Sequence, residues 1–112
     1  MKLDLKTPPR KFTVGKKSVV ISDVAQIKLD PEEQITFITN DGREYDFCAK
    51  SWGFYASPSI NGRLKNFGFK MALVANEDDK IFILAVSESK MDEFKVYLED
   101  EGLKIIDWLD QS

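Results

Sequence analysis

The amino-acid sequence predicts an α+β fold, an antiparallel β-meander of five or six strands covered on one face by a C-terminal amphipathic helix. Short runs of β-branched and aromatic residues alternate with Gly, Pro, Asn and Asp, which is typical of strands joined by tight turns. One apolar stripe at helical spacing lies near the C-terminus. With 112 residues, of which 43% are hydrophobic and 31% charged, residues 1–112 are predicted to form a single domain, with residues 1–10 as a flexible arm.

The first two strands are expected on either side of a glycine-containing turn. Phe12–Val14 and Ser18–Leu29 are rich in β-branched residues, and Gly15–Lys17 separates them in the manner of a hairpin. The turn Asp30–Glu33 should end the second strand, because its proline cannot donate a hydrogen bond to a sheet.

The strongest hairpin signal is Asn40–Gly42, since these residues tolerate positive backbone φ angles. It should join a strand over Gln34–Thr39 to a strand over Arg43–Cys48. Strand alternation then places four large side chains on one face, which we expect to belong to the core: Ile35, Phe37, Tyr45 and Phe47.

A short helix is predicted near residues 58–67. The pair Ser57-Pro58 resembles a helix start, because serine caps free amides and proline suits the first helical turn. Ile60, Leu64 and Phe67 then recur at helical spacing.

Two further strands, Phe69–Ala75 and Lys80–Ser87, are expected around the polar turn Asn76–Asp79. The amphipathic helix should follow over Lys90–Glu101. Ser89 with Asp92 forms a capping-box pattern, the apolar stripe is Met91, Phe94 and Leu98, and Gly102 ends the helix. Leu103–Leu109 is predicted to return as a final strand, with a further helical turn as the alternative.

Cysteine content and hydropathy bear on the compartment. Cys48 is the only cysteine, which excludes an intramolecular disulfide and favours a reducing compartment, so a cytoplasmic protein is expected. The longest strongly apolar run, Ile81–Val86, is far shorter than the roughly 20 residues of a membrane span. No membrane role is expected.

The chain contains no histidine, which removes the commonest general base at neutral pH and the commonest neutral metal ligand. A catalytic triad with histidine cannot be built from this chain. We therefore expect no metal, no other cofactor and no generic hydrolytic activity. Cys48 beside Lys50 leaves open a small enzyme with a reactive thiolate, since a nearby cation favours that form, although most single cysteines are buried packing residues.

The segment from Lys50 to Lys70 is the candidate binding site. It lies within an acid-free stretch from Phe47 to Asn76 in a chain of net charge -3, and it combines aromatic rings, hydroxyls, amides and cations. An anion would meet no local repulsion there, and the planar guanidinium of Arg63 suits phosphate or carboxylate. The residues predicted to bind the ligand are Lys50, Tyr55, Ser57, Asn61, Arg63 and Lys65. The alternative, purely structural interpretation places the segment's aromatic side chains in the core: Trp52, Phe54, Phe67 and Phe69.

The Lys50–Lys70 segment, together with the Asp107-Trp108-Leu109 ending, resembles small uncharacterised bacterial proteins associated with surface-polysaccharide and sugar-nucleotide gene clusters. The resemblance covers about the second half of the chain. It implies a bacterial accessory protein and carries over no catalytic residue.

The leading hypothesis is a non-catalytic bacterial binding or accessory domain that acts on a partner protein or on a small anionic sugar or nucleotide ligand. One alternative is a small enzyme that uses Cys48, Tyr55 or Lys50. Another is a single-stranded RNA binder whose Trp52, Phe54 and Tyr55 stack on bases, although the net charge does not favour nucleic acid. The sequence leaves a homodimer open.

Overall fold

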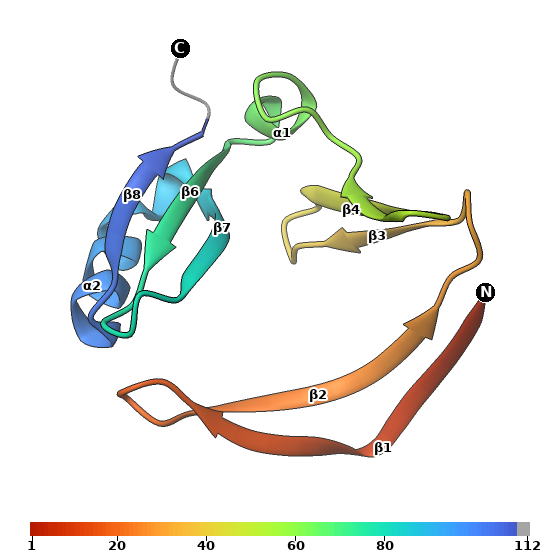
Figure 1. Cartoon of the computed structure of the whole chain (residues 1–112), viewed down its shortest axis with the longest axis horizontal. Helices are drawn as coiled ribbons and strands as arrows, with labels where there is room; N and C mark the ends of the chain where they lie inside the picture. Colours follow the sequence, from red (N-terminus) through yellow and green to blue (C-terminus); the bar gives the residue numbers. More distant parts are fainter. Residues whose placement is uncertain (110–112) are drawn as a thin grey trace. The chain divides into compact units, whose positions relative to one another are not determined.

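The structure, a computed structural model, describes residues 1–109. Contacts divide the chain into two compact units, Met1–Ser57 and a second unit that begins at Pro58. Within residues 1–109 there are three small antiparallel sheets with eight strands in all, together with two α-helices and one 3-10 turn (Figure 1). The fold is therefore α+β, as predicted, but it has eight strands in three sheets instead of one meander of five or six strands.

Strands β1 (Lys2–Val14) and β2 (Val19–Lys28) form a long two-stranded ribbon, here called the hairpin (Figure 1). Residues 1–10 were predicted to be a flexible arm, and in the structure residues 2–10 belong to β1. Leu3 and Leu5 pair with Ile27 and Ala25 and so extend the ladder toward the N-terminus. The two consecutive prolines lie where the register shifts between Leu5 and Arg10, in a bulge that needs no ladder donors.

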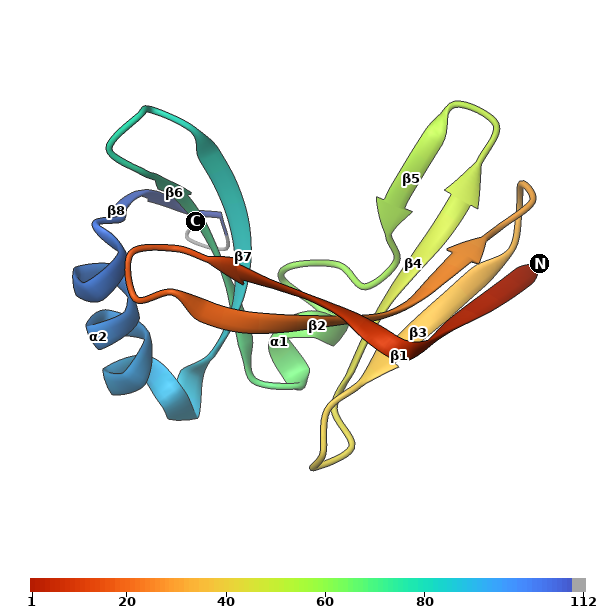
Figure 2. The same cartoon turned by 90° about the horizontal axis from the view of Figure 1, so that it is seen from below.

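The second sheet of the first unit has the order β3-β4-β5, with β4 in the middle (Figure 2). Its strands are β3 (Gln34–Ile38), β4 (Glu44–Lys50) and β5 (Gly53–Ala56), and no strand was predicted over β5. The hairpin at Asn40–Gly42 is confirmed, with Gly42 at a φ of 86°.

The expected apolar face of this sheet is confirmed in register but not in burial. Ile35 lies opposite Phe47, and Phe37 lies opposite Tyr45. The rings of Phe37 and Phe47 meet edge to face at 5.9 Å. Phe37 is nevertheless 54% exposed and the other three side chains are only half-buried, so these residues do not form a closed core.

In the second unit, α1 (Arg63–Asn66) has only four residues, so the helix predicted near 58–67 is shorter than expected. Its N-cap is Gly62, which makes no side-chain cap, and Ser57 lies well before the helix. A side chain at position 62 would clash with the Ser59 hydroxyl. Residues 60–62 form turns instead of helix.

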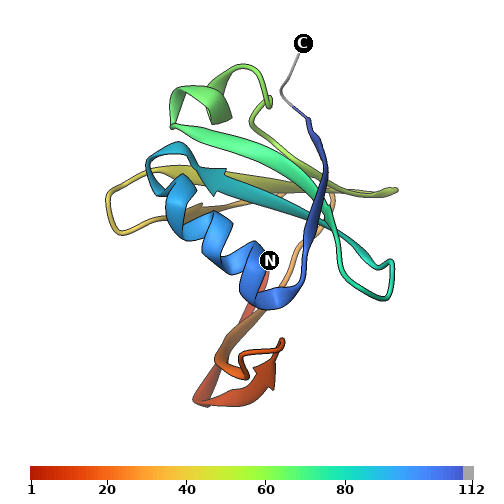
Figure 3. The same ribbon diagram turned by 90° about the vertical axis from the view of Figure 1, so that its left-hand side faces the viewer.

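The third sheet has the order β7-β6-β8, formed by β6 (Phe69–Ala75), β7 (Ile81–Ser87) and β8 (Lys104–Trp108). Helix α2 (Met91–Glu101) lies against one face of this sheet (Figure 3). It ends at Gly102, whose φ of 64° gives the expected left-handed C-cap. The predicted final strand is confirmed as β8.

The predicted capping box is wrong. Ser89 belongs to a 3-10 turn, η1 (Glu88–Lys90), and the N-cap of α2 is Lys90 with no side-chain cap. The Ser89 hydroxyl instead lies 3.0 Å from that of Ser87. The 3-10 turn moves the serine away from the position that a cap requires.

The core of the second unit lies between α2 and the sheet. Phe94 is buried and packs edge to face on Trp108, with ring centroids 6.1 Å apart. Below it the central strand contributes Ala72 and Val74, both fully buried. The apolar stripe of α2 is therefore confirmed as the face that contacts the sheet.

Candidate functional site

The six predicted ligand-binding residues divide between the two units. Lys50, Tyr55 and Ser57 belong to the first unit, whereas Asn61, Arg63 and Lys65 belong to the second. On that basis the prediction of one anion site over all six residues stays a prediction.

Within the first unit, the predicted residues already have protein partners. The Lys50 ammonium lies 2.8 Å from a carboxylate oxygen of Glu32, and this hydrogen bond raises the pKa of Lys50. The same ammonium lies 5.7 Å from the centre of the Tyr55 ring. The Ser57 hydroxyl donates to the side-chain oxygen of Gln34 at 2.6 Å. The charge on Lys50 is thus largely balanced by Glu32, which weakens its attraction for an anion.

Within the second unit, three predicted residues are exposed: Asn61 precedes α1, and Arg63 and Lys65 lie in it. The predicted anion site relied on free amides of a helix beginning at Ser57-Pro58. Because α1 begins at Arg63 and has one turn, the amides that follow Ser57 do not form a helix terminus.

The aromatic side chains around β5 do not form a core. Trp52 is 72% exposed and stacks on Tyr55, with centroids 6.4 Å apart. Phe54 is 69% exposed and points to the opposite face of β5 from Tyr55, because neighbouring strand residues alternate. The structural interpretation is thus wrong for Trp52 and Phe54, although Phe69 is buried. The opposed directions also prevent Phe54 from joining the Trp52–Tyr55 stack.

Cys48 is buried and lies opposite Tyr55 in the β4–β5 register. A hydrogen-bonding contact with the Cys48 side chain raises the pKa of Tyr55. The Cys48 thiol contacts the carbonyl oxygen of Ala49 at 3.5 Å. Burial places the thiol out of reach of a solute in this geometry, which argues against a nucleophilic role.

Asp46 is the buried carboxylate of the first unit, with 4% of its surface exposed. The side-chain amide of Gln34 donates to Asp46 Oδ2 at 3.2 Å, and the backbone N–H of Ser57 donates to the Asp46 carbonyl at 2.8 Å. These bonds connect β3 and the end of β5 to the central strand. Asp46 and Gln34 therefore have a structural explanation that the sequence pattern did not reveal.

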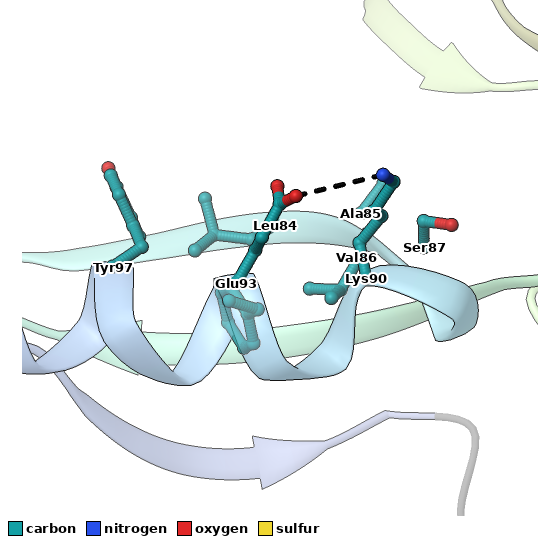
Figure 4. Close-up of a pocket in the computed structure, with 8 residues that line it drawn as sticks. Leu84, Ala85, Val86, Ser87, Lys90, Glu93 and Tyr97 are labelled. Carbon is teal, nitrogen blue, oxygen red and sulfur yellow. Dashed lines mark ion pairs between the residues drawn. The ribbon is translucent and has the colours of Figure 1, made fainter.

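A groove of about 330 Å³ lies between β7 and α2 in the second unit (Figure 4). Its apolar lining includes Leu84, Val86, Phe94 and Tyr97, and Lys90 and Glu93 form an ion pair at 3.6 Å beside it. This volume is at the lower end of the range for small-molecule sites. The sequence signal for the groove was Tyr97, an aromatic residue three positions after Phe94 and outside the predicted stripe.

One face of the hairpin exposes many apolar side chains. Residues that lie opposite each other in the ladder share a face, so the register assigns each side chain. One face, here called the hairpin's apolar face, carries seven large hydrophobic side chains that are 37–66% exposed. They are Leu3, Leu5, Phe12, Val14, Val19, Ile21 and Ile27.

An ionic cluster interrupts the hairpin's apolar face at the bulge. Asp23 Oδ2 lies 2.6 Å from the Lys6 ammonium and 3.2 Å from Arg10 Nε. The hydrogen bond from Lys6, with a smaller contribution from Arg10, holds the pKa of Asp23 below its ordinary value. The opposite face of the ribbon is mixed, with Lys11, Thr13 and Ser22 among its members.

Neither metal chemistry nor a membrane helix finds support in residues 1–109. In that range no group of three or more Cys, Asp or Glu side chains is placed to hold a metal ion. No helix there is long and apolar enough to cross a membrane. Comparison of the chain with protein-family models, curated proteins and solved structures gave no match. The resemblance to bacterial accessory proteins therefore stays a prediction.

Proposed function

We propose that this protein is a non-catalytic binding module that assembles with a second copy of itself through the hairpin's apolar face. The observation that carries the proposal is the exposure of all seven large hydrophobic side chains on one side of a two-stranded ribbon. Isolated two-stranded hairpins are marginally stable in water, and exposed apolar patches mark interaction sites. The Lys6–Arg10–Asp23 cluster divides this face into two apolar patches, one toward each end of the ribbon.

The size of this face supports a dimer. Its seven side chains expose on the order of 550 Å², so docking on a surface of equal size would bury about 1,100 Å² in total. That area is above the roughly 1,000 Å² expected of a biological interface. Two equivalent contacts in a symmetric dimer would bury about twice as much.

The proposal is tested by the concentration dependence of the mass of the full chain in sedimentation equilibrium. The wild-type protein is expected to dimerise below about 100 μM, the range of an interface with a micromolar Kd. Ile21→Glu and Leu5→Glu each place a carboxylate on the hairpin's apolar face. We expect at least about tenfold weaker association for both, because burying an unpaired charge is costly.

The matched control is Val20→Glu. Val20 neighbours Ile21 in β2, is also exposed, and lies on the opposite face of the ribbon. This variant should associate like the wild-type protein. A wild-type chain that stays monomeric up to about 100 μM, or equal weakening by Val20→Glu and Ile21→Glu, would refute the proposal.

A second candidate function is binding of a small anionic ligand at the exposed Trp52–Tyr55 stack. The stack offers an aromatic surface for a base or sugar, and Lys50 lies near the Tyr55 ring. Titration with a nucleoside diphosphate and with inorganic pyrophosphate should shift the amide resonances around Tyr55 in an NMR spectrum. Trp52→Ala should abolish shifts caused by the nucleotide, whereas shifts confined elsewhere would reject this candidate.

A further inference from the structure

The hairpin is strongly basic, which restricts the surface on which it can dock. Residues 1–28 contain seven lysines and arginines and only two aspartates. Two of the lysines, Lys16 and Lys17, lie in the turn between β1 and β2. Two hairpins placed face to face would therefore bring like charges together, which disfavours that arrangement. An acidic surface with apolar side chains would complement the hairpin.

Helix α2 supplies acidic charge in the second unit. Its eleven residues include five acids and one lysine. The acids are Asp92, Glu93, Glu99, Asp100 and Glu101. The charge on α2 is thus opposite in sign to the charge on the hairpin, and opposite potentials favour both encounter and specificity.

Apolar surface lies directly beside this acidic helix. The groove between β7 and α2 exposes Tyr97, and Phe82 of β7 is also about half exposed. In the β7-β6-β8 sheet, β7 is an edge strand, so its outer backbone groups face no neighbouring strand. Edge strands with apolar side chains are frequent sites of association with a further strand.

We propose that the hairpin of one molecule docks on the α2–β7 groove of a second copy, and that the second copy returns the same contact. This inference rests on the proposed self-association and names the receiving surface. The receiving surface combines an apolar groove, an acidic helix and an open strand edge. The hairpin is basic and has one apolar face, so the two surfaces are complementary. Reciprocal contacts close the assembly at two molecules, because each hairpin and each groove is then used once.

A mixing experiment separates this arrangement from hairpin-on-hairpin pairing. Ile21→Glu disables the hairpin and leaves the groove intact. Tyr97→Glu disables the groove and leaves the hairpin intact. Each variant alone should associate at least about tenfold more weakly than the wild-type protein. In an equimolar mixture one intact hairpin meets one intact groove, so native mass spectrometry should show heterodimer in at least about tenfold excess over either homodimer.

The control for the groove variant is Val96→Glu. Val96 neighbours Tyr97 on α2 and is exposed, but it does not line the groove. It should dimerise like the wild-type protein. Amide spectra of each isolated variant establish that it is folded, and Leu5→Glu replaces Ile21→Glu if the latter is not.

The outcomes distinguish this inference from the proposed function. A wild-type dimer that is weakened by Ile21→Glu but unaffected by Tyr97→Glu would overturn the groove as the receiving surface while leaving self-association in place. A monomeric wild-type chain would overturn both. Raising the salt concentration from about 0.05 M to 0.5 M should weaken the wild-type dimer, because screening reduces attraction between opposite charges. Association that strengthens with salt would contradict the charge argument.

Discussion

The hairpin and the β7-β6-β8 sheet each have an apolar face, yet these two faces differ in burial. In the three-stranded sheet, α2 covers one face, and Ala72 and Val74 are fully buried. In the hairpin, no residue of β1 or β2 is buried. Strand alternation therefore specifies which side chains share a face. Whether that face becomes a core depends on whether another element covers it.

The two regions should also differ in how their stability depends on association. A three-stranded sheet with a packed helix has the elements needed for independent stability, whereas a two-stranded ribbon is marginal in water. We therefore expect substitutions in the core of the second unit to change the stability of the monomer. Substitutions on the hairpin's apolar face should mainly weaken the association of two molecules.

The largest expected effect is that of Phe94→Ala. Removing this buried ring from its contact with Trp108 should lower the free energy of unfolding of the second unit by about 3–5 kcal/mol. Urea unfolding is followed by the fluorescence of Trp108 in a Trp52→Phe background, in which Trp108 is the only tryptophan. A loss below about 1 kcal/mol would mean that α2 does not cover the sheet in this way.

Phe12→Ala makes the same change on the hairpin's apolar face, and its effect on the monomer should be much smaller. Phe12 is 37% exposed, and the Arg10 guanidinium lies 4.9 Å from the centre of its ring. Such an exposed cation–π contact contributes about 0.5–1 kcal/mol. We expect a loss of about 1 kcal/mol in urea unfolding at concentrations well below the dimer Kd. A loss as large as that of Phe94→Ala would show that the face is covered within one molecule.

The smallest expected effect is an acid-dependent loosening of the hairpin at Asp23. Its pKa is lowered chiefly by the hydrogen bond from Lys6, against an ordinary value near 3.8. A carboxyl group whose pKa is lower in the folded state stabilises that state at pH values above its ordinary pKa. This stabilisation is lost as the pH falls through the pKa of the folded state. Because the pair lies on a thin two-stranded ribbon and both side chains still contact solvent, the effect on stability should be slight.

The measurement is a carboxyl ¹³C NMR titration of Asp23. In the wild-type protein its midpoint should lie below 3.8, and Lys6→Gln should move it upward. In Asp23→Asn, the amide shifts of Ser22 and Arg10, next to Asp23 in the ladder, should lose most of their response to acid in this range. A wild-type midpoint at or above 3.8 would contradict the geometry of the Lys6–Asp23 pair.

Much of the candidate site could not be predicted from the sequence. The acid-free segment drew attention to Lys50 and Arg63, but acid-free sequence does not guarantee acid-free surroundings, and Glu32 from an earlier turn neutralises Lys50. The hairpin's apolar face was missed because residues 1–10 were predicted to be a flexible arm and not a strand. The repeated leucines and valines of residues 3–21 were the signal that could have revealed it.

Features that depend only on residues close together in the sequence could be predicted from the sequence alone. The turn at Asn40–Gly42, the end of α2 at Gly102 and the stripe containing Phe94 all follow from local φ angles and periodicity. The division of the eight strands into three sheets depends on tertiary contacts. The same is true of the exposure of Trp52 and the burial of Phe94. Strand partners and covering helices come from distant parts of the chain, so periodicity specifies a face but not what lies against it.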